Sequence, residues 1–191
     1  MTLDEEKKLV KKAKKDPEAF GRLYDEYYPR IFGYVLRRTA NLEMAQDVVS
    51  ETFLKALKNL RRFKWIGAFR SNSSFGAWLY RIAANEIVNF WRRKKPTVSL
   101  EIISDPSSDQ NILEEIARAQ EKLARHQDFL MVQKEIMTLP EKYQEVLTLR
   151  FFEKKQIKEI AEILGKREGT IKSLIHRGIE RLRRDLPPLS H

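Results

Sequence analysis

The chain has 191 residues, of which 42% are hydrophobic, and a formal net charge of +10 from 37 Lys and Arg against 27 Asp and Glu. The hydrophobic content excludes a disordered chain and supports one large or two small packed domains. The excess of basic residues favours a polyanionic partner, either nucleic acid or an anionic membrane surface.

Residue types that usually carry metal and redox chemistry are scarce. The chain has no cysteine, which excludes disulfides and thiolate chemistry, and its three histidines, His126, His176 and His191, are too scattered to suggest a metal site. We therefore expect no metal, no cofactor and no small-molecule substrate. The longest stretch without a charged residue runs only from Ser71 to Tyr80, and the N-terminus has no apolar signal core. We expect a cytoplasmic protein without a membrane span.

Helical periodicity dominates the first half of the chain. Proline is absent from residues 30–95, which favours long helices. Apolar residues recur at helical spacing in three segments, and none of these segments shows the sustained alternation of a strand. The three apolar stripes are Phe20, Leu23, Tyr24, Tyr27, Ile31 and Val35; then Ala45, Val48, Val49, Thr52, Phe53, Ala56, Leu57 and Leu60; then Trp78, Leu79, Ile82, Ala83, Ile87 and Phe90. We therefore predict an all-α fold.

The helical pattern stops at residues 96–111, which are rich in proline, serine and aspartate. The charge also changes, because residues 96–117 contain five acidic and no basic residues, whereas residues 61–95 contain nine basic residues and one acid, Glu86. A solvated linker explains this composition, and an acidic strap that occupies an empty nucleic-acid channel is the alternative. We predict two small helical domains, residues 1–95 and 129–187, joined by residues 96–128 as an acidic and then helical linker.

The last third of the chain has the pattern of a helix-turn-helix. One apolar stripe ends at Gly165 and another begins at Ile171, so two short helices can bury their stripes against each other. The stripes comprise Ile157, Ile160, Ala161 and Leu164, then Ile171, Leu174, Ile175, Ile179 and Leu182. The outer face of the second helix carries Lys172, Ser173, His176, Arg177, Arg181 and Arg184. Such a face suits a DNA major groove, and an ordinary hairpin with a solvated basic face is the alternative. Pro140 marks the start of the preceding helix.

A polar stripe precedes the linker. Its four residues, Arg81, Asn85, Asn89 and Arg92, fall at helical spacing opposite Leu79, Ile82 and Ile87. Asparagine and arginine read base edges and grip phosphates. Residues 63–75, just ahead, mix aromatic, basic and small polar residues, which suits unstacked single-stranded bases. The alternative for Trp65, Phe69 and Phe75 is an ordinary place in the core.

Asp47 and Glu51 lie one helical turn apart on the preceding helix. Paired carboxylates can form a metal or acid–base site. No second acidic pair or nearby histidine accompanies them, so a solvated or partner-facing surface is the favoured interpretation.

Two sets of motifs resemble those of one known family. Residues 47–56, Asp-Val-Val-Ser-Glu-Thr-Phe-Leu-Lys-Ala, followed by Phe69-Arg70 and by residues 75–85, Phe-Gly-Ala-Trp-Leu-Tyr-Arg-Ile-Ala-Ala-Asn, look like domain 2 of the extracytoplasmic-function (ECF) sigma factors. Residues 139–143, 159–165 and 169–173 look like domain 4. The resemblance covers nearly the whole chain in the family's order, with the linker where the family has one.

This resemblance implies a bacterial RNA polymerase specificity subunit with no catalytic activity of its own. It implies core RNA polymerase as the obligate partner and promoter DNA as a second partner. An anti-sigma factor, if the chain has one, would be a third. It also implies that the −35 element is read as duplex and the −10 element as an opened single strand, with the linker running towards the RNA exit path.

The residues that match the family's motifs take their expected roles from it. For polymerase binding these are Asp47, Ser50, Glu51 and Phe53, with Ser50 in place of the family's usual Gln. For the −10 element they are Arg70, Ser71, Asn72, Trp78, Arg81, Asn85, Asn89 and Arg92. For the −35 element they are Arg167, Thr170, Lys172, Ser173, His176, Arg177 and Arg181.

Two other classes of protein fit parts of the sequence. A helix-turn-helix regulator would bind duplex DNA without polymerase, but it needs no pocket for an unstacked base. A nucleic-acid-processing enzyme would need a catalytic carboxylate cluster or a nucleophile, which the sequence does not show.

Overall fold

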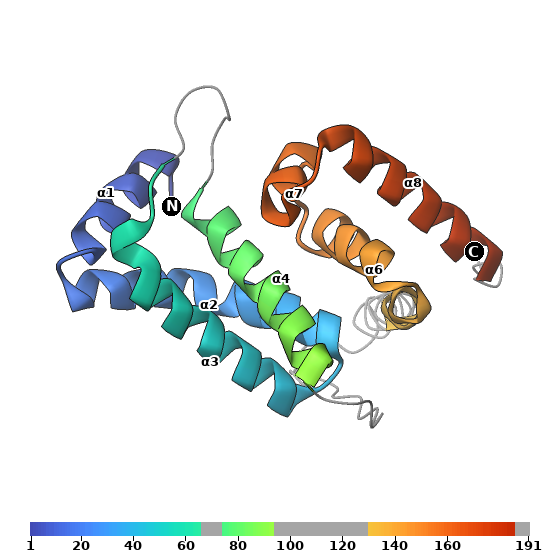
Figure 1. Ribbon diagram of the computed structural model, residues 1–191, viewed down its shortest axis with the longest axis horizontal. Coiled ribbons are helices and arrows are strands. Elements are labelled where there is room, and N and C mark those ends of the chain that lie inside the picture. The colour runs from blue at the N-terminus through green and yellow to red at the C-terminus, as the bar shows by residue number, and fades with distance from the viewer. Residues whose placement is uncertain (66–73, 94–129, 186–191) are drawn as a thin grey trace, which may run out of the picture.

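The computed structural model describes residues 1–65, 74–93 and 130–185, and every regular element in these ranges is helical (Figure 1). The predicted all-α fold is therefore confirmed. In chain order the elements are α1 (Leu3–Ala13), α2 (Pro17–Thr39), α3 (Leu42–Asn59), the 3-10 turn η1 (Leu60–Arg62), α4 (Phe75–Arg93), a helical segment at residues 130–138, α6 (Glu141–Leu147), the π-helical turn η2 (Thr148–Phe152), α7 (Ile157–Leu164) and α8 (Glu168–Asp185).

Side-chain caps begin the helices where the sequence changes pattern. Thr2 and the Glu5 side chain form a capping box at the start of α1, and Asp16 accepts a hydrogen bond from the Glu18 N–H at the start of α2. The Asn41 side chain accepts a hydrogen bond from the Met44 N–H at the start of α3. Such caps satisfy backbone donors that have no partner inside the helix. Helix α6 begins directly after Pro140, as predicted.

The N-terminal helices bury the three predicted stripes in one core. Helix α2 packs against α1, α3 and α4, and α3 packs against α4. Most stripe residues are buried or half-buried, with two exceptions. Tyr24 is 38% exposed and Leu57 is 48% exposed, although both lie in predicted apolar stripes. Each directly follows a fully buried residue, Leu23 or Ala56, so each falls just past the edge of the buried arc.

The predicted helix-turn-helix is formed by α7 and α8. Gly165 ends α7 in the left-handed conformation, with φ of 63°, which glycine adopts without strain. Helix α8 packs against both α6 and α7. At Gly178 an added Cβ would lie 3.0 Å from Leu147 Cδ1, so the absence of a side chain lets α8 approach α6 closely.

The two groups of helices are in contact, because α4 packs against α7 and α2 against η2. Figure 1 shows α7 beside the N-terminal part of α4. The predicted linker, residues 96–128, lies outside the described residues. The domain limits 1–95 and 129–187 therefore stay predictions.

Candidate nucleic-acid interface

Helix α8 presents a basic, exposed face. Lys172, Ser173, His176 and Arg177 are all exposed, whereas Ile171 on the opposite side is fully buried. Arg167 and Thr170, just before and within the first turn, are exposed as well. His176 Nδ1 lies 3.6 Å from a Glu180 carboxylate oxygen. A face of this kind can enter a DNA major groove.

Arg181 differs from the other residues predicted on this face. It is exposed, but its guanidinium lies over the Tyr143 ring, 5.1 Å from the centroid. This cation–π contact ties α8 to α6. Arg181 therefore has a packing contact in addition to any contact with phosphate.

The four residues of the polar stripe on α4 differ in their exposure and in their hydrogen-bond partners. Asn85 and Arg92 are exposed, but Asn89 donates a hydrogen bond of 3.2 Å to the Glu86 side chain. Arg81 donates hydrogen bonds to the main-chain carbonyls of Glu162 and Ile163, at the end of α7. The C-terminal carbonyls of a helix carry partial negative charge, which favours a guanidinium there. The remaining predicted −10 residues, Arg70, Ser71 and Asn72, lie outside the described residues.

A pocket of about 330 Å³ brings two of the predicted −10 residues together. Trp78 and Asn85 both line it, with Phe63 adding a second aromatic ring. The complete lining is Lys55, Asn59, Arg62, Phe63, Trp78, Ile82, Asn85 and Glu86. Ile82 is predicted on the side opposite Asn85, and this prediction is wrong, because both residues face the pocket. The sequence prediction also missed Lys55, Asn59 and Arg62, which come from α3 and η1.

Two of the three charged residues that line the pocket, Lys55 and Glu86, form an ion pair, and the third is Arg62. Lys55 Nζ lies 2.6 Å from a Glu86 carboxylate oxygen and 3.5 Å from one of Glu51. The hydrogen bond that Lys55 donates to Glu86 raises the pKa of Lys55, so the ammonium stays charged. Glu86 is buried, and its pairing with Lys55 offsets the cost of burying its charge. The pocket thus combines aromatic rings, an amide, an ion pair and the Arg62 guanidinium.

The aromatic residues ahead of α4 belong mainly to the core. Phe75 is fully buried, and Trp65 is half-buried with its ring edge-on to Phe63 at 5.3 Å. The core alternative therefore holds for Phe75. Phe69 lies outside the described residues.

Helix α3 exposes a separate surface. Asp47 and Ser50 are exposed and Glu51 is half-buried, so these three predicted polymerase-binding residues share one side of the helix. Phe53 does not share it. Only 5% exposed, Phe53 packs against Tyr24 at 4.6 Å and Tyr28 at 6.3 Å between ring centroids. Its expected place beside Asp47 and Glu51 on the partner-facing surface is corrected to a place in the core.

Two apolar residues extend the α3 surface. Leu54 is 44% exposed and follows Asp47 by two helical turns, and Leu57 is exposed nearby. Neither was predicted as a binding residue. The signal was present in the sequence, because Leu54 falls outside the apolar stripe of its helix.

Comparison with known proteins decides the family. Residues 23–97 match the family model Sigma-70 region 2, and residues 129–182 match Sigma-70, region 4. The chain is 34% identical over 194 residues to the ECF RNA polymerase sigma factor SigW of Bacillus subtilis (strain 168), covering 96% of this chain and 97% of SigW. It belongs to the ECF sigma factors of the sigma-70 family.

Other proteins are similar to the chain over most of their length. The RNA polymerase sigma-H factor of Pseudomonas aeruginosa is 31% identical over 194 residues, covering 99% of this chain and 97% of that protein. The structure of CnrH in complex with the cytosolic domain of CnrY has the same fold, with a TM-score of 0.64 at 22% identity over 94% of this chain and 95% of CnrH. The sigma factor RpoE from Bartonella quintana, solved with the anti-sigma factor NepR, has a TM-score of 0.62 at 20% identity over 86% of this chain and 94% of RpoE.

Polar contacts join the two groups of helices in this sigma factor. The Glu153 carboxylate accepts hydrogen bonds from the Arg37 guanidinium at 2.5 Å and from the Tyr80 hydroxyl at 2.6 Å. Arg38, which is buried, donates a hydrogen bond of 2.6 Å to Gln144. Burial raises the pKa of Tyr80, so its hydroxyl stays protonated and donates. The sequence prediction missed all of these contacts.

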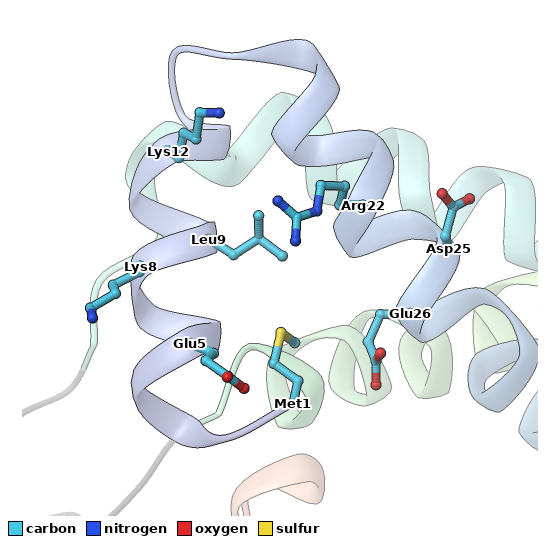
Figure 2. Close-up of a pocket in the computed structure, with 8 residues that line it drawn as sticks. All are labelled: Met1, Glu5, Lys8, Leu9, Lys12, Arg22, Asp25 and Glu26. Atoms are coloured by element: carbon cyan, nitrogen blue, oxygen red, sulfur yellow. The ribbon is translucent and has the colours of Figure 1, made fainter.

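A second hollow, of about 810 Å³, lies between α1 and α2 of the sigma factor (Figure 2). Its lining mixes basic and acidic side chains around Leu9 and contains none of the predicted site residues. Within the described residues, no group of three histidine or acidic side chains could hold a metal ion. None of the described helices is long and apolar enough to cross a membrane.

Proposed function

We propose that this sigma factor binds core RNA polymerase through the exposed side of α3 and directs it to promoters. In this proposal α8 reads the −35 element as duplex DNA, and the pocket between α3 and α4 receives a base from the opened −10 element. The family supports the coarser part of the proposal, namely promoter-specific transcription initiation. An anti-sigma factor is included among the proposed partners, since RpoE was solved with one.

The pocket carries the finer part of the proposal. Trp78 and Phe63 offer aromatic surface on which a base can stack, and Asn85 offers an amide that can both donate to and accept from a Watson–Crick edge. Lys55 is paired with Glu86, and Arg62 adds a positive charge to the lining that suits the phosphate next to such a base. A regulator that reads only duplex DNA has no use for such a pocket.

The basic face of α8 supports duplex reading. Its exposed residues Lys172, Ser173, His176 and Arg177 include donors suited to base edges and phosphates. The buried Ile171 on the opposite side fixes the helix against α6 and α7. The polar and apolar exposure on α3, from Asp47 to Leu54, supports a protein partner there.

Asn85→Ala tests the proposal most directly. With holoenzyme reconstituted from core polymerase, the variant should bind core and form closed complexes as the wild type does, because Asn85 is exposed and belongs to α4 rather than to α8. Open-complex formation should fall, seen as lost permanganate reactivity of thymines at the −10 element. The isosteric Asn85→Asp should fail in the same way, since it loses the amide donor. Wild-type reactivity in both variants would contradict the proposed role of the pocket.

The alternative function, a helix-turn-helix regulator that binds duplex DNA without polymerase, is tested in the same preparation. If the chain does not co-purify with core polymerase but binds duplex DNA alone, it acts as a regulator that works without polymerase. Co-purification followed by run-off transcription from a selected promoter excludes that alternative.

A further inference from the structure

Helix α1 carries a buried acid on its apolar side. Glu6, Val10 and Ala13 form the buried stripe of α1, and Glu6 is only 4% exposed. A buried carboxylate without hydrogen bonds is strongly destabilising. Glu6 avoids this cost through contacts with two other helices, α2 and α4.

The Glu6 carboxylate joins α1 and α2 to the first turn of α4. One of its oxygens accepts a hydrogen bond from the Tyr27 hydroxyl and another, 3.2 Å long, from the Gly76 N–H. Gly76 is the second residue of α4, so its N–H has no acceptor within the helix. The partial positive charge at this helix end also favours a carboxylate. Glu6 thus caps α4 from 70 residues away in the sequence.

Local sequence around this contact fits the same role. The Ser74 hydroxyl accepts the next N–H, that of Ala77, at 3.0 Å. An added Cβ at Gly76 would lie 2.9 Å from Tyr27 Cε1, so a side chain there would displace the Tyr27 ring. Burial raises the pKa of Tyr27, which keeps its hydroxyl protonated as a donor to Glu6.

Helix α1 also holds the chain that leads up to residues 66–73. The Lys14 ammonium donates a hydrogen bond of 2.7 Å to the Phe63 carbonyl, and the Lys7 ammonium lies 5.9 Å from the Trp65 ring centroid. Glu6 holds the chain that follows, at Gly76. Phe63, which lines the pocket, and Gly76, in the first turn of α4, are therefore both held by α1 or by its C-cap residue Lys14.

We propose that α1 positions the pocket between α3 and α4, with Glu6 as its principal positioning residue. Glu6 fixes the first turn of α4, and Trp78 lies at the end of that turn, on the wall of the pocket. Glu6 itself does not line the pocket. The family model for region 2 begins at residue 23, so α1 lies outside the matched segment. This inference rests on the proposed function of the pocket.

The test compares Glu6→Ala, Glu6→Gln and Tyr27→Phe in reconstituted holoenzyme. The probe is a promoter fragment enriched from a random library by wild-type holoenzyme and labelled with 2-aminopurine in the −10 element. Glu6→Ala should open this fragment roughly tenfold more slowly, the size expected for loss of a buried hydrogen bond to a charged group. Core affinity and closed-complex affinity should be unchanged. Glu6→Gln should retain most of the opening rate, because its amide oxygen can accept both hydrogen bonds.

Two controls separate positioning from general stability. Tyr27→Phe removes only the hydroxyl that donates to Glu6, and this variant should also open the promoter fragment more slowly than the wild type. It keeps the proposal testable if Glu6→Ala does not fold. Val10→Ala shortens a fully buried neighbour on the same stripe without touching the carboxylate. Its opening rate should match the wild type. An equal opening defect in Val10→Ala would overturn the proposal.

The same experiment distinguishes this inference from the proposed function. Suppose that the wild type opens the fragment and that Asn85→Ala does not. If Glu6→Ala and Tyr27→Phe then both open it at the wild-type rate, the positioning role of Glu6 is overturned and the proposed function of the pocket is retained. If wild-type holoenzyme opens no fragment, both are overturned.

Discussion

The Arg37 guanidinium lies 2.5 Å from the Glu153 carboxylate, across the contact between α2 and η2. The Glu153 side chain is 6% exposed and that of Arg37 is 27% exposed. Removing one partner of a buried pair leaves the other without its compensating charge. The contact between the two groups of helices therefore depends strongly on one carboxylate.

Glu153→Gln should lower the free energy of unfolding by about 1–3 kcal/mol, less than for a fully buried pair because water reaches Arg37. Urea denaturation at neutral pH measures the change. Glu26→Gln is the matched control, because Glu26 pairs with Arg30 at 3.1 Å on the surface and within one helix. That pair should contribute only about 0.3–0.5 kcal/mol. Equal losses in the two variants would contradict the importance assigned to Glu153.

Asp47→Lys combined with Glu51→Lys should weaken binding to core polymerase. Charge changes at an exposed surface usually alter stability by less than about 0.5 kcal/mol, so the double variant should remain folded. Co-purification and competition against wild-type chain measure the affinity. Asp25→Lys reverses an exposed charge on α2 instead and should bind core as the wild type does. Unchanged affinity in a folded double variant would remove α3 as the binding surface.

Lys172→Ala and His176→Ala should each relax preference at a single −35 position and cost about 1–3 kcal/mol of binding to the preferred sequence. Arg181→Ala should weaken binding to all sequences alike, as expected for a phosphate contact. Because Arg181 also lies over Tyr143, the urea midpoint of unfolding of the Arg181→Ala variant should be measured in parallel. Selection from randomised −35 sequences separates the two outcomes. A uniform loss from Lys172→Ala and His176→Ala would mark both residues as backbone contacts.

Glu145 should make stability depend on pH. Burial raises the pKa of Glu145 above its ordinary value of 4.5, so the folded chain binds this proton more tightly than the unfolded chain does. Its contribution to stability is therefore largest at low pH and declines as pH rises from about 4.5 towards the raised pKa. Glu145→Gln should remove this decline and increase the free energy of unfolding at neutral pH. Urea titrations between pH 4.5 and 7 would show parallel curves for both chains if the assignment is wrong.

Helices and their buried faces could be predicted because the signal is local. Val48, Val49, Thr52 and Ala56 recur at helical spacing, and all four are buried on α3. The same periodicity placed Phe53 in the stripe, while the family resemblance assigned it to the partner-facing surface. The structure agrees with the periodicity, since Phe53 packs against Tyr24 and Tyr28.

Contacts between distant segments could not be predicted in the same way. Glu153 meets Arg37 from 116 residues away, and Arg81 meets Glu162 from 81 residues away. No spacing rule relates such pairs, because they depend on how whole helices pack. Lys55 and Arg62 reach the pocket for the same reason, although Trp78 and Asn85 could be identified from their own helix. The sequence contains one local indication of the role of Glu6, because this acid lies at helical spacing from the buried Val10 and Ala13.

The hydrogen bonds from Arg81 to the end of α7 have a consequence for promoter affinity. If α4 reads the −10 element and α8 the −35 element, their targets are about 25 base pairs apart, roughly 85 Å along the DNA. Arg81 holds α4 against α7, and α7 packs against α8, so α4 and α8 cannot reach targets that far apart in this arrangement. Binding to both elements must therefore first separate them, and the apparent Kd equals the intrinsic Kd divided by the fraction of molecules already separated. Side chains such as Glu153, which need never touch DNA, would thus help to set how tightly a two-element promoter is bound.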